Sequence, residues 1–192
     1  FPHESCNVIA RTVGFGPAKG VIGAHFDTAP LTQGAGDNAS GVAILLELAR
    51  LLHGKNNGWN LDFAAFSAEE YIPETLPPGS GDYVARHQRE DIRWFLNFDD
   101  IGLLFGEPQI RTVLSEKLPP LHSGAFPICP STHTDGDDRS FKQIGVPGIW
   151  YRDESFFRQF HTERDSIDTI DFGKMAAAAT DALEIFRQLT GK

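Results

Sequence analysis

Histidine and acidic side chains recur along this sequence in short groups, and their nitrogen and oxygen atoms are ligands that zinc takes from proteins. The residues in these groups are His25, Asp27, Asp37, Glu69, Glu70, Asp99, Asp100 and His161, of which Asp27 is a candidate partner for His25 and not a ligand. Each group alone is weak evidence, because a His-x-Asp or two adjacent acids also occur in ordinary turns. The chemistry therefore depends on whether the fold brings these groups together.

Three of these groups have a local arrangement that suits metal chemistry. Asp37 stands in a glycine-rich loop, 34–41, where the backbone can approach closely and the two carboxylate oxygens can serve two metal ions. Glu69 and Glu70 are adjacent and point in different directions, so one can bind a metal while the other acts on a water as a general base. Asp27 could accept a hydrogen bond from His25 and fix its ring.

Short apolar runs predict the strands that would position these groups. The predicted strands are 21–26, 61–66, 92–98 and 146–151, with 7–13 as a further edge strand. His25 lies near the end of the first run, the paired acids follow the second and third, and His161 comes shortly after the fourth. Ligands in open α/β sheets bind outside the carboxyl ends of the strands. We therefore expect the candidate groups to face one crevice.

The segments between these runs have helical spacing. Helices are predicted at 39–52, around 83–87 and at 172–189, with Asn38 and Asp171 as possible amino-terminal caps. Strands that alternate with helices favour an α/β protein. We predict a single domain over residues 1–192, a three-layer α/β/α sandwich with a mixed, mainly parallel sheet and helices on both faces.

The composition excludes several classes of partner. The net charge of −9 argues against nucleic acid, and no apolar run approaches the roughly 20 residues that a membrane helix needs. We therefore expect neither nucleic acid nor a membrane as a partner. The sequence indicates neither a compartment nor an oligomeric state.

Taken together, five ordered segments resemble metallopeptidase family twenty-eight, the two-zinc aminopeptidases and their carboxypeptidase relatives. The resemblance extends from about Asn7 to the final helix. The segments that carry it are Gly23-Ala24-His25-Phe26-Asp27, Gly36-Asp37-Asn38-Ala39-Ser40-Gly41, Phe66-Ser67-Ala68-Glu69-Glu70, Asn97-Phe98-Asp99 and His161-Thr162.

This resemblance implies two zinc ions per chain and a role for each matching residue. His25 and Asp99 would complete one zinc site, Glu70 and His161 would complete the other, and Asp37 would bridge them. Glu69 would be the general base, and Asp27 would hold His25. In the family a tyrosine or another donor often assists the oxyanion, and Tyr151, the last residue of the fourth predicted strand, is our candidate.

The sequence departs from the family pattern at two places beside the expected pocket. The link after Glu70 is lengthened by residues 71–78 before Gly79-Ser80. The family often has Ser-Asp-His with Phe three residues later, whereas this chain has Gly136-Asp137-Asp138 before Phe141, so the histidine is missing. Both changes affect the expected substrate preference.

We expect an aminopeptidase acting on peptides with a free amino terminus, because the acidic loop Asp135 to Asp138, with Asp153 and Glu154, could bind the amine. A carboxypeptidase of the same family is the nearest alternative, with Arg139, Arg152 or Arg158 to bind a carboxylate. A glutaminyl cyclase with one zinc, and a binding domain without catalysis, are further alternatives. The complete ligand set argues against both.

Overall fold

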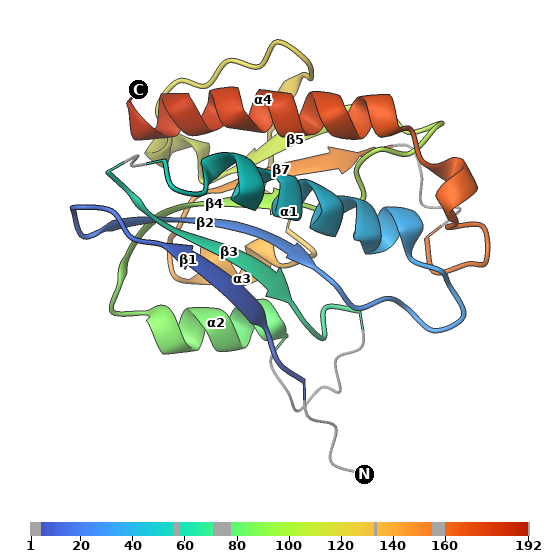
Figure 1. The fold of residues 1–192 in the computed structure, drawn as a ribbon, viewed down its shortest axis with the longest axis horizontal. Helices are drawn as coiled ribbons and strands as arrows, with labels where there is room; N and C mark the ends of the chain where they lie inside the picture. Colours follow the sequence, from blue (N-terminus) through green and yellow to red (C-terminus); the bar gives the residue numbers. More distant parts are fainter. Residues whose placement is uncertain (1–4, 56–57, 71–77, 133, 155–159, 192) are drawn as a thin grey trace.

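In the computed structural model, which describes residues 5–55, 58–70, 78–132, 134–154 and 160–191, a seven-stranded sheet forms the centre of the protein (Figure 1). The strand order is β1-β3-β2-β4-β7-β5-β6. The strands are β1 (Val8–Thr12), β2 (Ala18–His25), β3 (Asn60–Phe66), β4 (Asp91–Phe98), β5 (Pro108–Val113), β6 (Ile128–Pro130) and β7 (Gly148–Asp153).

The four central strands β3, β2, β4 and β7 run parallel to one another. Edge strand β1 is antiparallel to β3, β5 is antiparallel to β7, and β6 is parallel to β5. The prediction of a mixed, mainly parallel sheet is therefore confirmed. Because the central strands share one direction, His25, Phe66 and Phe98 end β2, β3 and β4 at the same edge of the sheet.

Helices cover both faces of this sheet, as predicted (Figure 1). Helices α1 (Ser40–Leu52) and α4 (Phe172–Thr190) lie on one face and pack against each other. Helices α2 (Gly79–His87) and α3 (Asp138–Gln143) lie on the other. No helix among the described residues is long and apolar enough to cross a membrane.

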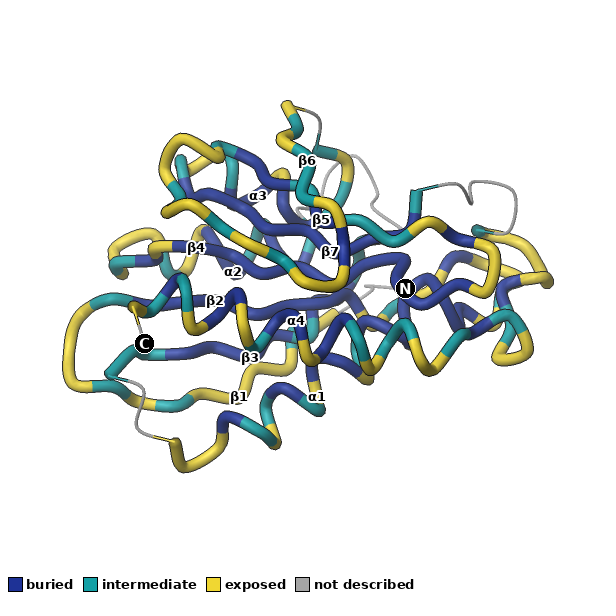
Figure 2. Tube along the Cα trace, turned by 90° about the horizontal axis from the view of Figure 1, so that it is seen from above, coloured by how far each residue is buried: buried dark blue, intermediate teal, exposed yellow. Residues whose placement is uncertain are grey.

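Two apolar clusters fill the space between the sheet and the two helix layers. Ile44 and Leu48 of α1 join Ala182 and Ile185 of α4 beneath one face. On the other face, Tyr83 of α2 and Phe141 of α3 pack with Phe66 and Phe95 from the sheet. The central strands between these clusters are buried along most of their length (Figure 2). Because these strands carry apolar side chains on both faces, their segments of the sequence are continuous apolar runs.

A network of charged side chains lies near the amino ends of the parallel strands. The carboxyl ends of β2, β3 and β4, described above, lie at the opposite end of these strands. Asp62 of β3 is fully buried, and its carboxylate accepts hydrogen bonds from Arg11, Lys19 and Tyr83. Lys19 also pairs with Glu90, which directly precedes β4. These contacts tie β1, β2, β3 and α2 together at one end of the sheet.

Candidate metal centre

His25 meets two carboxylates at the carboxyl end of β2. Its Nε2 atom lies 3.1 Å from Asp37 Oδ1 and 3.1 Å from Asp99 Oδ1. Asp37 lies in the loop between β2 and α1, and Asp99 directly follows β4. All three residues are buried. The structure thus brings together one nitrogen and two oxygens from three separate segments, and these three residues form the first donor set.

A second donor set shares Asp37 with the first. His161 Nε2 lies 3.2 Å from Asp37 Oδ2 and 2.8 Å from Glu70 Oε2. Asp37 therefore directs Oδ1 to the first set and Oδ2 to the second. Glu70 follows β3, whereas His161 comes from the segment after β7 and is exposed.

Both donor sets fit a zinc ion in atom type and in spacing. Ligand atoms about 2.0 Å from one zinc at tetrahedral angles lie about 3.3 Å apart, close to the separations of 2.8 to 3.2 Å seen here. Glu70 Oε1 is buried without a hydrogen-bond partner among the described residues, and a metal ion at this donor set would compensate for that. The two sets sharing one carboxylate would hold two ions as neighbours.

Several carboxylates lie close together in this centre, and their proximity and burial shift their pKa values. Burial, followed by the charge of Asp99, raises the pKa of Glu69 to about 9. Burial and the adjoining carboxylate of Asp37 raise the pKa of Glu70 to about 8. Bound cations would favour the ionised form of both glutamates and so reverse these shifts.

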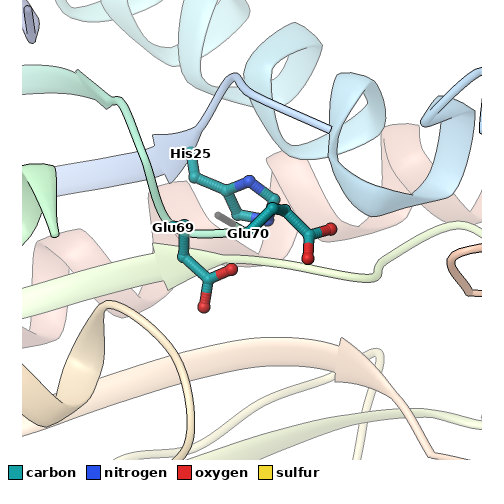
Figure 3. A group of neighbouring side chains, drawn as sticks. All are labelled: His25, Glu69 and Glu70. Carbon is teal, nitrogen blue, oxygen red and sulfur yellow. The ribbon is translucent and has the colours of Figure 1, made fainter. Parts of the chain in front are cut away.

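Glu69 and Glu70 leave the loop after β3 in different directions, while His25 approaches from the end of β2 (Figure 3). Glu69 lines a cavity of about 270 Å³ beside the donor sets. The cavity is lined by His25, Asp37, Glu69, Asp99, Asp100, Asp135, Gly136, Trp150, Arg152, Phe160 and His161. Donor atoms of Glu69, His25 and Glu70 also lie within 4.8 Å of one another, so these three could form a further donor group. Because Glu69 faces the cavity and is not one of the donors that Asp37 links, its carboxylate suits the acceptance of a proton from a water.

The carboxylate of Asp27 makes closer contacts with the backbone of the loop that carries Glu69 and Glu70 than with His25. Its carboxylate accepts hydrogen bonds from the backbone N–H of Glu69 and of Glu70, at 3.1 Å and 3.0 Å. His25 Nδ1 lies 3.0 Å from the backbone oxygen of Asp27 and 3.7 Å from its carboxylate. The nearest acceptor for His25 is therefore the main chain of Asp27 rather than the carboxylate that the sequence suggested.

Asp165 holds the loop that carries the shared carboxylate, and the sequence reasoning missed it. Its buried carboxylate accepts from the backbone N–H of Gly36 at 2.6 Å and of Asp37 at 3.0 Å. Asp165 follows His161 by four residues, so one segment supplies a donor of the second set and also fixes Asp37. In the sequence, the position of Asp165 shortly after the candidate ligand His161 was the feature that could have indicated this role.

Glycine is required where the same loop enters α1. A Cβ atom on Gly41 would lie 2.2 Å from Asn38 Oδ1 and 2.5 Å from the backbone oxygen of Phe98. Asn38 uses that side chain to accept from Gly41 N and to donate to Phe98 O. The loop thereby stays against the end of β4, beside Asp99.

The structure does not place Tyr151 at this centre, and our prediction for that residue is wrong. Tyr151 is fully buried against α4, where its hydroxyl donates to Asp181 at 2.8 Å, and it does not line the cavity. Strand β7 continues to Asp153, two residues beyond the predicted end. Because side chains alternate along a strand, Trp150 and Arg152 reach the cavity and Tyr151 points to the other face.

Only part of the acidic and basic sets expected around the substrate lines the cavity. Among the expected acids, Asp135 lines it; Asp137 and Asp138 are buried, and Asp153 accepts from the backbone of residues 102 and 103. Glu154 does not line it and instead pairs with Arg111 and Arg152. Among the expected arginines, Arg152 lines it, while Arg139 is exposed on α3. Arg158 and the lengthened link at 71–77 lie outside the described residues.

Known proteins resemble this chain in sequence over most of its length. The family model described as Peptidase family M28 matches residues 7–186. Protein YfbL of Escherichia coli (strain K12) is 29% identical, over 88% of this chain and 67% of that protein.

Solved structures share the fold over almost the whole chain. An aminopeptidase from Aneurinibacillus sp. strain AM-1 has a TM-score of 0.80 and 25% identity, covering 95% of this chain and 47% of that one. BSAP, a zinc aminopeptidase from Bacillus subtilis, has a TM-score of 0.79 and 22% identity, covering 94% and 49%. A Bacteroides thetaiotaomicron glutaminyl cyclase has a TM-score of 0.74 and 19% identity, covering 97% and 77%. The chain thus spans about half the length of these two aminopeptidases.

Proposed function

This chain belongs to peptidase family M28, and on that basis we propose that it is an aminopeptidase that hydrolyses the amino-terminal bond of peptides with two zinc ions. The observation that carries the proposal is the position of Asp37. Its two oxygens lie 3.1 Å and 3.2 Å from His25 and His161, in different donor sets. A carboxylate shared in this way supports two adjacent ions rather than one.

In this proposal each donor set binds one zinc. His25, Asp37 and Asp99 would hold the first ion, and Asp37, Glu70 and His161 would hold the second. Zinc bound there would supply a Lewis acid for the peptide carbonyl and lower the pKa of a water.

Glu69 is proposed as the general base. Its carboxylate lines the cavity beside the first donor set, and it would take a proton from the attacking water and deliver it to the leaving amine. Asp27 holds Glu69 in place through the backbone of residues 69 and 70. Asp135 lines the cavity with a side chain that is 46% exposed, and it is the acid we assign to the free amine of the substrate.

The two main alternatives differ in metal content and in substrate. A glutaminyl cyclase would be expected to lack a productive second set, whereas both sets have their donors here. A binding domain without catalysis would be expected to have lost donors. The fold that the chain shares with aminopeptidases and with a glutaminyl cyclase makes turnover the deciding measurement.

The test combines zinc content per chain with hydrolysis of leucine 4-nitroanilide, with the amine free or acetylated. We expect about two zinc ions per chain and cleavage that requires the free amine. Glu69→Gln should keep the zinc and lose about 10²- to 10⁴-fold in turnover. Glu116→Gln, an exposed site far along the chain from the donors, is the matched control. Unchanged turnover in Glu69→Gln would exclude the assigned base, and one zinc without hydrolysis would favour the cyclase.

A further inference from the structure

The further donor group lies beside the two sets that share Asp37. Ligand atoms of His25, Glu69 and Glu70 lie within 4.8 Å of one another (Figure 3). His25 is buried, and the side chain of Glu70 is only 4% exposed. Glu70 Oε2 faces His161, whereas Oε1 is buried without a hydrogen-bond partner among the described residues. Glu70 therefore retains an oxygen atom that its contact with His161 does not use.

All three members of the further donor group are held by one residue, Asp27. Its carboxylate accepts hydrogen bonds from the backbone N–H of Glu69 and of Glu70, and its backbone oxygen lies 3.0 Å from His25 Nδ1. His25 ends β2, and the two glutamates follow β3, which pairs with β2 in parallel. The group is therefore preorganised at two neighbouring strand ends, and it loses little conformational entropy when it binds an ion.

The two sets that share Asp37 combine more distant segments of the chain. The first draws on the ends of β2 and β4 and on the loop before α1. The second depends on His161, whose side chain is 59% exposed. More of the chain must be ordered to complete either of these sets. This comparison favours the further donor group as the position of a lone ion.

We propose that the further donor group is a metal site of its own, which binds the first zinc ion and keeps the protein inactive until a second ion is bound. This inference rests on the proposed function, in which Glu69 is the general base. His25 Nδ1 faces the backbone oxygen of Asp27, so Nε2 is the nitrogen that is left for a metal ion. His25 therefore serves either the further donor group or the first donor set, but never both at once.

Occupation of this site removes the general base from use. A carboxylate that ligates a cation is held in its ionised form and shares its lone pairs with that cation, so Glu69 accepts no proton from a water. When two ions are bound, the sets that share Asp37 take His25 and one oxygen of Glu70, and Glu69 is released. Asp37 favours this arrangement at high zinc, because each of its two oxygens serves one ion.

The test identifies the carboxylate that holds the first equivalent of zinc, and it requires no turnover. Competition with a chromogenic chelator, at less than one zinc per chain, compares the parent with Glu69→Gln, Glu69→Asp and Asp99→Asn. Both Glu69 variants should bind this zinc at least about tenfold more weakly, because even groups that only orient a ligand contribute that much. Asp99→Asn and the exposed Glu116→Gln should bind it as the parent does. With excess zinc, Glu69→Gln should still hold about two ions, because the sets that share Asp37 do not use Glu69.

Turnover of leucine 4-nitroanilide by the unmodified protein provides a second measurement. It should stay at the background rate up to one equivalent of zinc and rise with the second equivalent. Unchanged affinity in both Glu69 variants with weaker binding in Asp99→Asn, or full turnover at one equivalent, would overturn the inference. A parent that stays inactive with two zinc ions, while both Glu69 variants lose affinity for the first equivalent, would instead refute the proposed peptidase activity and leave the metal site in place.

Discussion

Asp165 provides the sharpest test of how the shared carboxylate is positioned. Replacing it with Asn keeps the shape but presents one oxygen and one NH₂ group to two backbone N–H donors. The present carboxylate accepts from Gly36 at 2.6 Å and from Asp37 at 3.0 Å. In the variant one of these buried N–H groups must face another donor, because an amide has only one acceptor oxygen.

The expected loss follows from these two contacts. A hydrogen bond to a charged group contributes about 1.5–3 kcal/mol, so losing one should lower the free energy of unfolding by about 2 kcal/mol. Asp37 also lies in both donor sets, and disturbing a group that orients metal ligands weakens metal affinity by about 10- to 100-fold. We therefore expect Asp165→Asn to lower zinc affinity, whereas removing one hydrogen bond far from the donor sets should leave zinc affinity unchanged.

The assay is competition for zinc with a chromogenic chelator, beside denaturant unfolding of the metal-free protein. Asp168→Asn is the matched control, because it removes the same charge from an exposed side chain three residues later. Asp165→Asn should lose stability and zinc affinity, while Asp168→Asn should keep both. An Asp165→Asn protein that is less stable but binds zinc as tightly as the parent would refute the positioning role.

Two further predictions concern residues away from the donors. Tyr151→Phe should keep kcat and cost about 1 kcal/mol of stability, because it removes the 2.8 Å hydrogen bond to Asp181 and no group from the cavity; a hundredfold loss of kcat would contradict this. Burial alone would raise the pKa of Asp62, but hydrogen bonds from Arg11, Lys19 and Tyr83 lower it to about 2. The resulting stability is present above the unfolded pKa of about 3.8 and is lost as pH falls through about 2. Asp62→Asn should therefore be less stable than the parent by about 2 kcal/mol at pH 7, and denaturant unfolding should show this gap closing between about pH 4 and pH 2.

The donors could be predicted from the sequence because two regular patterns position them. Buried parallel strands read as continuous apolar runs, and parallel strands end at one edge of the sheet. Locating the ends of β2, β3 and β4 was therefore enough to expect the groups after them to meet. Strands β5 (Pro108–Val113) and β6 (Ile128–Pro130) and helix α3 (Asp138–Gln143) were missed. β6 and α3 have three and six residues, too few to show a period, and the run of β5 is interrupted by polar residues at 109, 111 and 112.

The contacts around the donors could not be predicted in the same way. The last predicted residue of β7, Tyr151, lies within the strand, which continues to Asp153, and its side chain points to the face opposite that of Trp150 and Arg152. Arg152 within that strand gave no apolar signal of its burial. Asp165 acts on backbone N–H groups more than a hundred residues away, and only the folded chain shows that contact.

The buried network around Asp62 lies at the amino ends of the strands, whereas the donor sets lie at their carboxyl ends. The network and the cavity therefore lie at opposite ends of the strands. Effects on stability of mutations in the network and of mutations in the cavity should add. This separation makes the protein a favourable starting point for directed evolution. Stabilising changes at one edge can offset the losses that altered specificity causes at the other.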